Sequence, residues 1–438
     1  MEGMVTVSKK EQKRAMVIGE VEKGEVGGRE GAAVLGISVR HLRRIMAAYR
    51  EEGVAALAHG NRGRKPANAI GEGMRRHMVE LAASTYSGFN QQHFTELLGE
   101  REGIHVSRSS VRNILLASGI RSPRKRRPTK HRGRRERYPK EGMLLQIDGS
   151  PHDWLQGRGP RMSLIGAIDD ATGTVPYALF REQEDSCGYF LLMKGIVSRR
   201  GVPGAVYHDG HSIFEVSADE REHQTVQEQF SGRPMLTQFG RLMAELGITS
   251  ISARSPQAKG RVERLWETFQ DRLVSELRLA EVSTMEAANC FLVGFLNRFN
   301  ARFAVPPREP GSVYGSAEGL STQALFCFKY DRVVGSDNVV RFNGHRLQLL
   351  PSLHRLNYAR CSVEVHEQLD GTLKVYYQGR YLDTSPAPAE APRAREPAPT
   401  ASTTASKPRP VSMPAPDHPW RRWVYRSNQQ SRHGDKIA

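Results

Sequence analysis

The chain has 438 residues, more than one ordinary hydrophobic core holds, so two to four domains are expected. Its formal net charge of +17 indicates a polyanionic partner such as nucleic acid. No apolar run approaches the ~20 residues that cross a bilayer, no secretory signal layout begins the chain, and the four scattered cysteines suit neither a zinc site nor a disulfide framework. These features predict a cytoplasmic protein that does not contact membranes.

Residues 1–60 are predicted to hold a first helix-turn-helix domain. The first 20 residues are polar and are assigned no structure. Ala32, Ala33 and Leu35 then recur at helical spacing, and Ser38 after a glycine turn is suited to cap a second helix. Such a helix can enter the major groove of DNA. Its outward residues would contact phosphates and guanine edges, and they are Arg40, His41, Arg43 and Arg44. The alternative is a helical hairpin with a solvated basic face.

Residues 61–70 are predicted to be a basic linker. Its Arg-Gly-Arg sequence suits a DNA minor groove, although an ordinary exposed linker has the same composition. The candidate contacts are Arg62, Arg64 and Lys65. Residues 71–120 repeat the helix-turn-helix pattern, with Ser107 as the cap of the second helix. The DNA-facing residues of that helix would be Arg108, Arg112 and Asn113. Two units in tandem predict a long asymmetric DNA site.

Residues 121–140 form a basic arm in which Glu136 is the single acidic residue. A block of like charges repels itself, so the arm is expected to be extended in the free protein and to bind DNA phosphates. The candidate contacts are Arg124, Lys125, Arg126 and Arg127. A solvated linker, the alternative, accounts for the extension but not for the single sign of charge.

Residues 141–310 change to an α/β pattern. Strands are predicted at 144–148, 161–169, 173–180, 202–207 and 248–251, and the later ones alternate with helices at 188–197, 236–246 and 257–279. Three strands in a row followed by this alternation predict a mixed five-stranded sheet flanked by helices. The first strand would end at Asp148, before a glycine turn. Most Asp residues in that setting only shape the turn.

Three motifs carry a resemblance to a known family. They are Gln-Ile-Asp-Gly-Ser-Pro-His-Asp-Trp at 146–154, Ala-Ile-Asp-Asp-Ala-Thr at 167–172, and Ser-Pro-Gln-Ala-Lys-Gly-Arg-Val-Glu-Arg at 255–264. Together with the tandem helix-turn-helix units and Phe-Asn-Ala-Arg-Phe at 299–303, they make the chain resemble DDE transposases of bacterial insertion sequences, of the unclassified ISNCY group. The resemblance covers roughly 25–385 and implies an RNase H-like integrase core.

The resemblance implies that Asp148, Asp209 and Glu263 are the catalytic carboxylates. Cleavage of a phosphodiester can use two divalent ions held by hard oxygen ligands, and carboxylates suit Mg²⁺ or Mn²⁺. Glu267, one helical turn beyond Glu263, is the alternative ligand. The residues of the helix start that would hold DNA phosphates are Lys259, Arg261 and Arg264. The segment between Asp209 and Glu263 is longer than the family's usual spacing, and residues 214–234 are expected to be a surface insertion.

The C-terminal part divides into two predicted regions. Residues 325–384 alternate in the manner of strands, with Asp370-Gly371 as a hairpin turn, and are expected to form a small β-barrel similar to that of integrase relatives. Residues 385–438 are rich in Pro, Ala, Ser and Thr and are predicted to be disordered.

The resemblance therefore implies a DNA transposase. It would bind the terminal inverted repeats of its element, cut their 3′ ends and join them to target DNA, as a dimer or higher oligomer on paired ends. The alternative is a non-catalytic DNA-binding regulator that retains the fold. Three converging carboxylates argue against the regulator, because their repulsion costs stability unless metal is bound. A structure-selective RNase H-like nuclease would not need two sequence-reading modules.

Overall fold

The computed structural model of the chain describes residues 8–58, 69–123, 135–216, 236–253, 259–353 and 355–387. The chain divides into two compact units, of which the first comprises Met1–Lys329 and His366–Leu373 and the second Tyr330–Val365 and Lys374–Ala438. Some predictions fall outside the described residues, namely those for the linker residues Arg62, Arg64 and Lys65, the arm residues Arg124, Lys125, Arg126 and Arg127, most of the insertion at 214–234, and the tail beyond 387.

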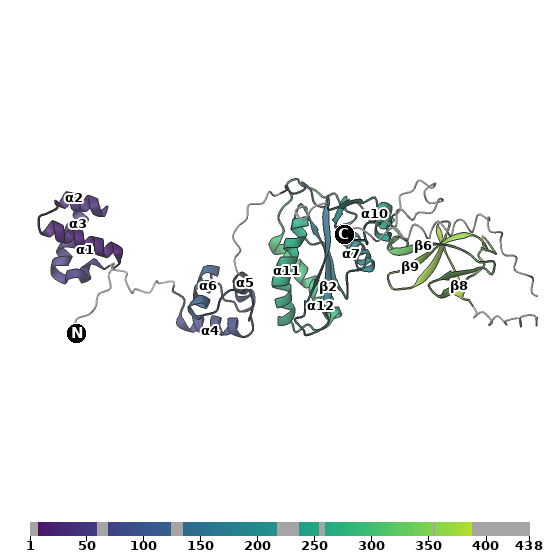
Figure 1. Cartoon of the computed structure of the whole chain (residues 1–438), viewed down its shortest axis with the longest axis horizontal. Coiled ribbons are helices and arrows are strands. Elements are labelled where there is room, and N and C mark those ends of the chain that lie inside the picture. The colour runs from purple at the N-terminus through teal and green to yellow at the C-terminus, as the bar shows by residue number, and fades with distance from the viewer. Residues whose placement is uncertain are drawn as a thin grey trace, which may run out of the picture. The chain divides into compact units, whose positions relative to one another are not determined.

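Three helices and a short 3-10 turn form the N-terminal part. They are α1 (Lys9–Glu22), α2 (Gly28–Leu35), α3 (Val39–Glu52) and η1 (Gly53–Leu57), labelled in Figure 1. Buried Ile18, Ala32, Leu42 and Leu57 make their shared core. The Ser38 side chain accepts a hydrogen bond from the His41 amide, which confirms the predicted cap of α3.

Helix α1 corrects the prediction that the first 20 residues carry no structure. Its start is a capping box, in which the Ser8 hydroxyl accepts from the Glu11 amide and the Glu11 carboxylate accepts from the Ser8 amide at 2.7 Å. Only Glu11, Val17 and Ile18 of this helix are buried, so its apolar stripe is too narrow to stand out in a charged sequence.

The second set of helices follows the predicted pattern. They are α4 (Glu72–Ala83), α5 (Gln91–Arg101) and α6 (Arg108–Ala117). The Asn90 side chain accepts from the His93 amide at the start of α5, and the Ser107 side chain accepts from the Ser110 amide at the start of α6. The predicted cap at Ser107 is therefore confirmed.

A mixed five-stranded sheet is the centre of the first unit. Its strands are β1 (Leu145–His152), β2 (Met162–Asp169), β3 (Ala178–Arg181), β4 (Ala205–His208) and β5 (Thr249–Ser252), in the order β3-β2-β1-β4-β5. Strands β1, β2 and β3 pair antiparallel, whereas β4 lies parallel to β1 and β5 parallel to β4. This confirms the predicted mixed sheet of an RNase H-like core.

Strands β2 and β5 lie within one residue of their predicted bounds, β4 begins three residues later than predicted, and β1 and β3 differ most. Strand β1 does not end at Asp148 but continues to His152, because Asp148 and Gly149 pair with Gly166 and Ile165 of β2. The predicted glycine turn is therefore wrong, and Asp148 lies in the middle of a strand. Strand β3 begins later than predicted, at Ala178, because hydrogen bonds between Asp169 and 172–174 close a turn there.

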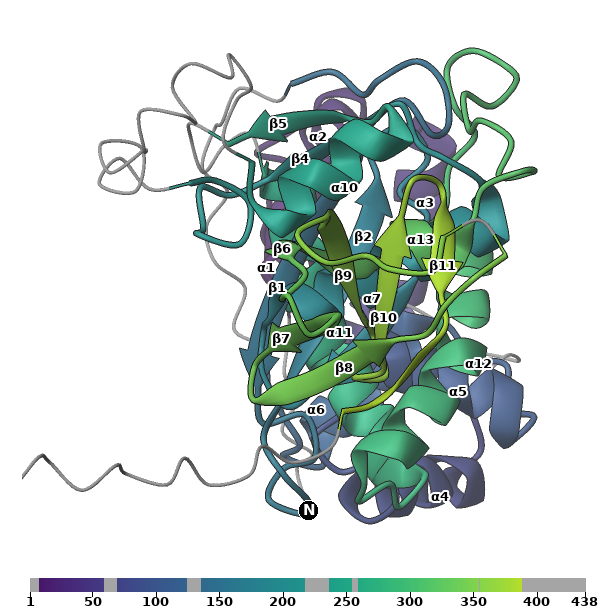
Figure 2. The ribbon, with the colours of Figure 1, turned by 90° about the vertical axis from the view of Figure 1, so that its right-hand side faces the viewer.

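Helices cover both faces of the sheet. Helices α7 (Ser186–Arg200) and α10 (Gln238–Leu246) pack on one face, and α11 (Gly260–Leu279) and α12 (Met285–Phe303) on the other. Figure 1 shows these layers on the two sides of β2, and Figure 2 shows β4 and β5 at one edge of the sheet. Each face has its own buried cluster, so the sheet is the middle layer of three.

The C-terminal strands follow a short helix, α13 (Thr322–Leu325). They are β6 (Cys327–Val333), β7 (Val339–Phe342), β8 (His345–Leu349), β9 (Ser362–Gln368), β10 (Leu373–Tyr377), β11 (Arg380–Leu382) and β12 (Thr384–Pro386). They form a four-stranded sheet, β11-β10-β9-β6, and a three-stranded sheet, β12-β8-β7, which Figure 2 shows. At the predicted hairpin turn, Gly371 has a left-handed φ of 83° and the Thr372 amide donates to Asp370.

Within the described residues, no helix combines the length and the apolar character that crossing a membrane requires.

Candidate active site

Strand β1 presents alternate side chains to helix α11. Leu145 and Ile147 point the other way, into the buried cluster with α7 and α10. Gln146 and Ser150, on the opposite side of the strand, face α11. The Gln146 side chain accepts from the Val262 amide at 3.3 Å, and Gln270 donates to the Ser150 hydroxyl at 3.2 Å. Because side chains of a strand alternate, Asp148 lies on this α11 face between Gln146 and Ser150.

The Asp148 carboxylate is held by two donors from α11 and its N-cap. The Lys259 ammonium donates to Oδ1 at 2.7 Å, and the Trp266 indole N–H donates to Oδ2 at 3.0 Å. Trp266 reaches this position by lying across Gly166, the β2 partner of Asp148, where an added Cβ would come 2.9 Å from the indole ring. The side chain of Asp148 is 18% exposed, so one of its sides is open to solvent.

Asp209 comes beside Asp148 because of the parallel pairing of β1 and β4. Gln146 pairs with Tyr207 in the register, and Asp148 and Asp209 each come two residues later, Asp209 just beyond the end of β4. The Asp209 Oδ2 atom lies 3.6 Å from the Lys259 Nζ atom, so one ammonium contacts both carboxylates. The structure thus brings together two of the three predicted carboxylates.

Glu263 lies on the correct side of α11 but does not contact the two aspartates. Lys259, Trp266 and Gln270, which all contact β1, define the direction in which the helix faces that strand. At 3.6 residues per turn, Glu263 lies about 40° from that direction and Glu267 about 80°. Helix geometry therefore favours Glu263 over Glu267. Among the residues that the structure describes, no hydrogen bond or ion pair joins Glu263 to Asp148 or Asp209.

The donor set suits a hard divalent cation in chemistry, although its third member is not in place. Carboxylate oxygens are the ligands that Mg²⁺ and Mn²⁺ prefer, and Asp148 and Asp209 already share a positive charge, that of Lys259. Across the described ranges, no three His, Cys, Asp or Glu side chains lie close enough to one another to hold a metal ion. The ammonium of Lys259 contacts both aspartates.

Two residues near this site were not predicted from the sequence. The Tyr189 hydroxyl of α7 donates to the Glu184 carboxylate, and burial together with the charges of Glu184, Asp148 and Asp209 raises the pKa of Tyr189 well above its usual value. The Glu184 carboxylate lies against the backbone of Gly149, where an added Cβ would come within 2.2 Å of it. A side chain at position 149 would therefore require the Glu184 carboxylate to shift.

Asp170 organises the basic residues around the start of α11. It is fully buried, and its Oδ1 accepts from Arg135 at 2.5 Å and from Arg261 at 2.7 Å, while its Oδ2 accepts from the Tyr138 amide at 2.9 Å. These contacts correct two predictions. Arg135 of the basic arm packs on the core instead of extending, and Arg261 binds a buried carboxylate where a phosphate contact was predicted.

The remaining predicted DNA-binding residues lie on the surface of their helices, apart from Lys259. Arg40, Arg43 and Arg44 on α3 are exposed, and His41 is half-buried. The exposed residues of α6 and α11 in this set are Arg108, Arg112, Asn113 and Arg264. Lys259 is buried against Asp148, so the predicted phosphate contact is not available to it in this arrangement.

Known proteins similar to the chain were found by sequence and by structure. A helix-turn-helix domain model matches residues 13–66. The chain is 34% identical over 385 residues to y4bF of Sinorhizobium fredii (strain NBRC 101917 / NGR234), a predicted transposase, covering 87% of this chain and 81% of the relative. It is 32% identical over 367 residues to the transposase for insertion sequence IS1202 of Streptococcus pneumoniae, covering 76% of each.

Two solved viral structures also match, at low TM-scores. The simian T-cell lymphotropic virus intasome in complex with the PP2A regulatory subunit B56 gamma has a TM-score of 0.30 and 14% identity, covering 71% of this chain and 100% of that one. The HTLV-2 integrase catalytic core domain in complex with magnesium has a TM-score of 0.25 and 15% identity, covering 36% of this chain and 86% of that one.

Proposed function

Because the chain belongs to the transposase family, we propose that it binds the terminal inverted repeats of an insertion sequence, cuts their 3′ ends and joins them to target DNA. Asp148, Asp209 and Glu263 are the proposed ligands of two Mg²⁺ or Mn²⁺ ions. When bound, the two ions would activate the attacking hydroxyl and stabilise the leaving oxygen. The proposed setting is the bacterial cytoplasm, on paired element ends held by a dimer or higher oligomer.

The observation that carries this proposal is the pairing of Asp148 and Asp209 around one cation. Asp148 lies in β1 and Asp209 directly follows the neighbouring parallel strand β4, and the Lys259 ammonium lies 2.7 Å from Asp148 and 3.6 Å from Asp209. Two carboxylates so close repel each other unless a positive charge lies between them. A place for a positive charge beside two carboxylates, in a chain that also has helix-turn-helix units, supports the proposal of a site for metal-dependent cleavage of DNA.

The side chains around the aspartates have separate proposed roles. Trp266 orients Asp148 by donating to Oδ2, so that the carboxylate would hold a metal ion in a fixed direction. Lys259 neutralises the aspartates in the free protein, and in the DNA complex it would contact a phosphate, as predicted from the sequence. Arg264 is exposed beside Glu263 and holds the DNA backbone. Arg261 acts by fixing the start of α11 to buried Asp170.

DNA recognition is assigned to the two helix-turn-helix units. Helices α3 and α6 follow the turns of their units and present exposed basic residues, which is the arrangement of a recognition helix in the major groove. Arg40, Arg43 and Arg44 of α3 and Arg108 and Arg112 of α6 are the proposed DNA contacts.

One contact keeps the non-catalytic regulator as a second candidate. The repulsion of the carboxylates argued against a regulator, but Lys259 relieves that repulsion without any metal. A regulator that retains the fold would therefore not lose stability through its aspartates. It would bind terminal-repeat DNA tightly and never cut it, with either Mg²⁺ or Mn²⁺.

The deciding experiment incubates the full chain with duplex DNA of its own element end and Mg²⁺, and separates nicked and joined products. Asp148→Asn is expected to lower both products by more than about 100-fold, because it removes a charged ligand shared by the ions, while DNA binding in a mobility-shift assay is unchanged. Glu263→Gln is expected to behave in the same way.

The matched controls are two nearby acids outside the proposed trio. Asp153→Asn, five positions along the chain from Asp148, and Glu267→Gln, one turn from Glu263, are expected to retain wild-type activity. Full activity of Asp148→Asn would show that the proposed catalytic role is wrong. Tight binding by the wild type with no cleavage in either metal would favour the regulator.

A further inference from the structure

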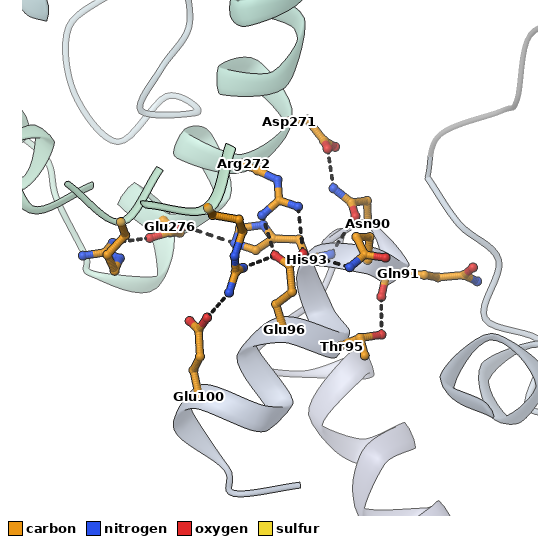
Figure 3. Close-up of polar contacts among 12 residues, drawn as sticks. Asn90, Gln91, His93, Thr95, Glu96, Glu100, Asp271, Arg272 and Glu276 are labelled. Carbon is orange, nitrogen blue, oxygen red and sulfur yellow. Dashed lines mark hydrogen bonds and ion pairs between the residues drawn. The ribbon is translucent and has the colours of Figure 1, made fainter. Parts of the chain in front are cut away.

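Helix α5 of the second helix-turn-helix unit is bound to the catalytic core by a set of charged side chains, which Figure 3 shows. We call this set the α5 interface. It consists of Asn90, His93, Glu96 and Glu100 at and on α5, Asp271, Arg272 and Glu276 on α11, and Arg298 and Arg302 on α12.

The contacts of the α5 interface are numerous and geometrically specific. Arg272 donates to both oxygens of Glu96, at 2.6 and 3.2 Å, and Arg302 pairs with Glu96 and Glu100. Glu276 lies 3.1 Å from the His93 ring and 2.6 Å from Arg298. Asn90 donates to Asp271 at the start of α5. Two arginines sharing one carboxylate fix its position better than a single pair does.

The central charges of the α5 interface are largely buried, which distinguishes them from ordinary surface ion pairs, whereas the side chains of Arg302, Glu100 and Arg298 at its edge are 36%, 46% and 54% exposed. The side chains of Arg272 and Glu96 are 9% and 14% exposed, and those of His93 and Glu276 are 2% and 9% exposed. Separating α5 from α11 would leave charges that have lost their partners in a poorly solvated place, whereas exposed pairs open at little cost. Leu279 of α11 also packs against the apolar cluster of α4–α6. The contact is therefore expected to stay closed.

Helix α11 contacts both the aspartates and the second helix-turn-helix unit. Its first turns contact Asp148 through Trp266, and its last turns contact α5 through Arg272 and Glu276. With a rise of 1.5 Å per residue, Glu263 and Arg272 are about 14 Å apart on this one helix. Helix α6 packs on α5 in one apolar cluster, so its exposed face is held relative to Asp148 through α5 and α11.

We propose that the second helix-turn-helix unit and the catalytic core work as one rigid body, in which the α5 interface sets the distance along the DNA between the bases contacted by α6 and the bond that is cut. This inference rests on the proposed function for the cutting step. Glu96 and Arg272 are positioning residues in it, because they act on the DNA through α5 and α6.

The first test reads rigidity directly in the full chain without DNA or metal. One spin label is placed on exposed native Cys290 of α12 and the other on Ser118→Cys at the end of α6, with Cys187 and Cys361 replaced by serine. The wild-type interface is expected to give one narrow distance distribution, and Glu96→Ala a broad one. A distribution that is already broad with the native interface overturns the proposal whether or not the protein cuts DNA.

The second test maps cut positions on element-end DNA at single-nucleotide resolution. Wild type is expected to cut one dominant bond. Glu96→Ala and Arg272→Glu are expected to lose that dominance to neighbouring bonds while α6 still protects the same bases in a footprint. A lower stability alone would reduce the total product without moving the cut. Sharp cutting at the native bond by Glu96→Ala, with its footprint retained, overturns the proposal.

A matched control and a rescue accompany the variants. Glu245 shares its carboxylate between Arg241 at 3.0 Å and Lys329 at 2.8 Å, as Glu96 does between two arginines, but it lies away from α5. Glu245→Ala is expected to keep both the narrow distance distribution and the dominant bond. Arg272→Lys, which keeps the charge, is expected to cut mostly at the wild-type bond, unlike Arg272→Glu. Failure of wild type to cut at all contradicts the proposed function, whereas the distance distribution still decides this inference.

Discussion

The two oxygens of Asp148 are held by donors with different properties. Trp266 offers a neutral N–H fixed in the buried cluster, while Lys259 offers a mobile charge that also reaches Asp209. The ammonium cancels the repulsion of two neighbouring carboxylates, which a divalent cation would otherwise do. A metal ion bound by both aspartates would have to displace Lys259, so we expect the lysine to make metal binding weaker than the aspartates alone would allow.

Replacing Lys259 with methionine tests this competition. The metal-free variant is expected to lose about 2 kcal/mol of unfolding free energy, less than for a fully buried pair because Asp209 is half exposed. Its stabilisation by Mn²⁺ is expected to reach half of its maximum at about ten-fold lower Mn²⁺ than in wild type, because no ammonium competes. Thermal unfolding across a Mn²⁺ titration measures both effects.

The control for this variant is Lys194→Met on exposed α7 surface, which is expected to match wild type in both measurements. An unchanged Mn²⁺ midpoint in Lys259→Met would mean that the lysine and the metal ion do not compete for the same binding site.

Sequence reasoning proposed Asp148 and Asp209 as site residues, which stays a prediction, but misjudged the local structure around Asp148. Asp148 before Gly149 has the composition of a turn, and nothing local shows that the Glu184 carboxylate lies against Gly149. Glu184 itself lies in a polar run and has no pattern that marks it. Lys259 and Arg261 have the charge expected of phosphate contacts, and only the folded chain shows that they face Asp148 and buried Asp170.

At the scale of elements, α11 contacts both the proposed active site and the second helix-turn-helix unit. Its N-terminal turns face β1 and its C-terminal turns face α5, so the helix buries two different sets of partners along its length. The helix could be predicted from its apolar stripe and the strands of the sheet from their periodicity. The α5 interface could not, because Glu96 and Arg272 are far apart in the sequence and each looks like an ordinary surface charge on an amphipathic helix.

The α5 interface should weaken in acid. Burial raises the pKa of Glu276, but hydrogen bonds from His93 and Arg298 outweigh it and leave the pKa below its ordinary value of 4.5. A carboxylate with a lowered folded-state pKa adds stability above its unfolded pKa, and this stability is lost as the pH falls through the folded value. Wild type is therefore expected to lose unfolding free energy below about pH 4.5.

Chemical denaturation between pH 3 and pH 6 measures this loss. Glu276→Gln is expected to start less stable at pH 6 and to lose less on acidification, so that the two curves converge. Glu318→Gln, at an exposed position, should follow wild type throughout. Parallel curves for wild type and Glu276→Gln would contradict the assigned role of this carboxylate.

At the scale of the whole molecule, the net charge of +17 acts on DNA before any specific contact forms. A field of this size raises encounter rates with a polyanion and makes the affinity depend on salt, because bound phosphates release counterions. Part of the basic composition is used internally, since Arg135, Arg261 and Arg272 pair with carboxylates of the same chain. Composition alone therefore predicts the class of partner but overestimates how many charges are available to it.

The salt dependence of binding can show which charges are available. The double variant Arg108→Ala/Arg112→Ala on α6 is expected to bind element-end DNA more weakly and to make the slope of log affinity against log salt less steep by about 1–2, that is, by the phosphate contacts removed. The control is Arg76→Ala, which removes an exposed charge on α4, outside the α5–α6 pair. This variant is expected to keep the wild-type slope. An equal change of slope per removed charge in Arg76→Ala and in the α6 variant would contradict this prediction. It would mean that DNA is attracted by the whole basic surface and that α6 makes no specific phosphate contacts.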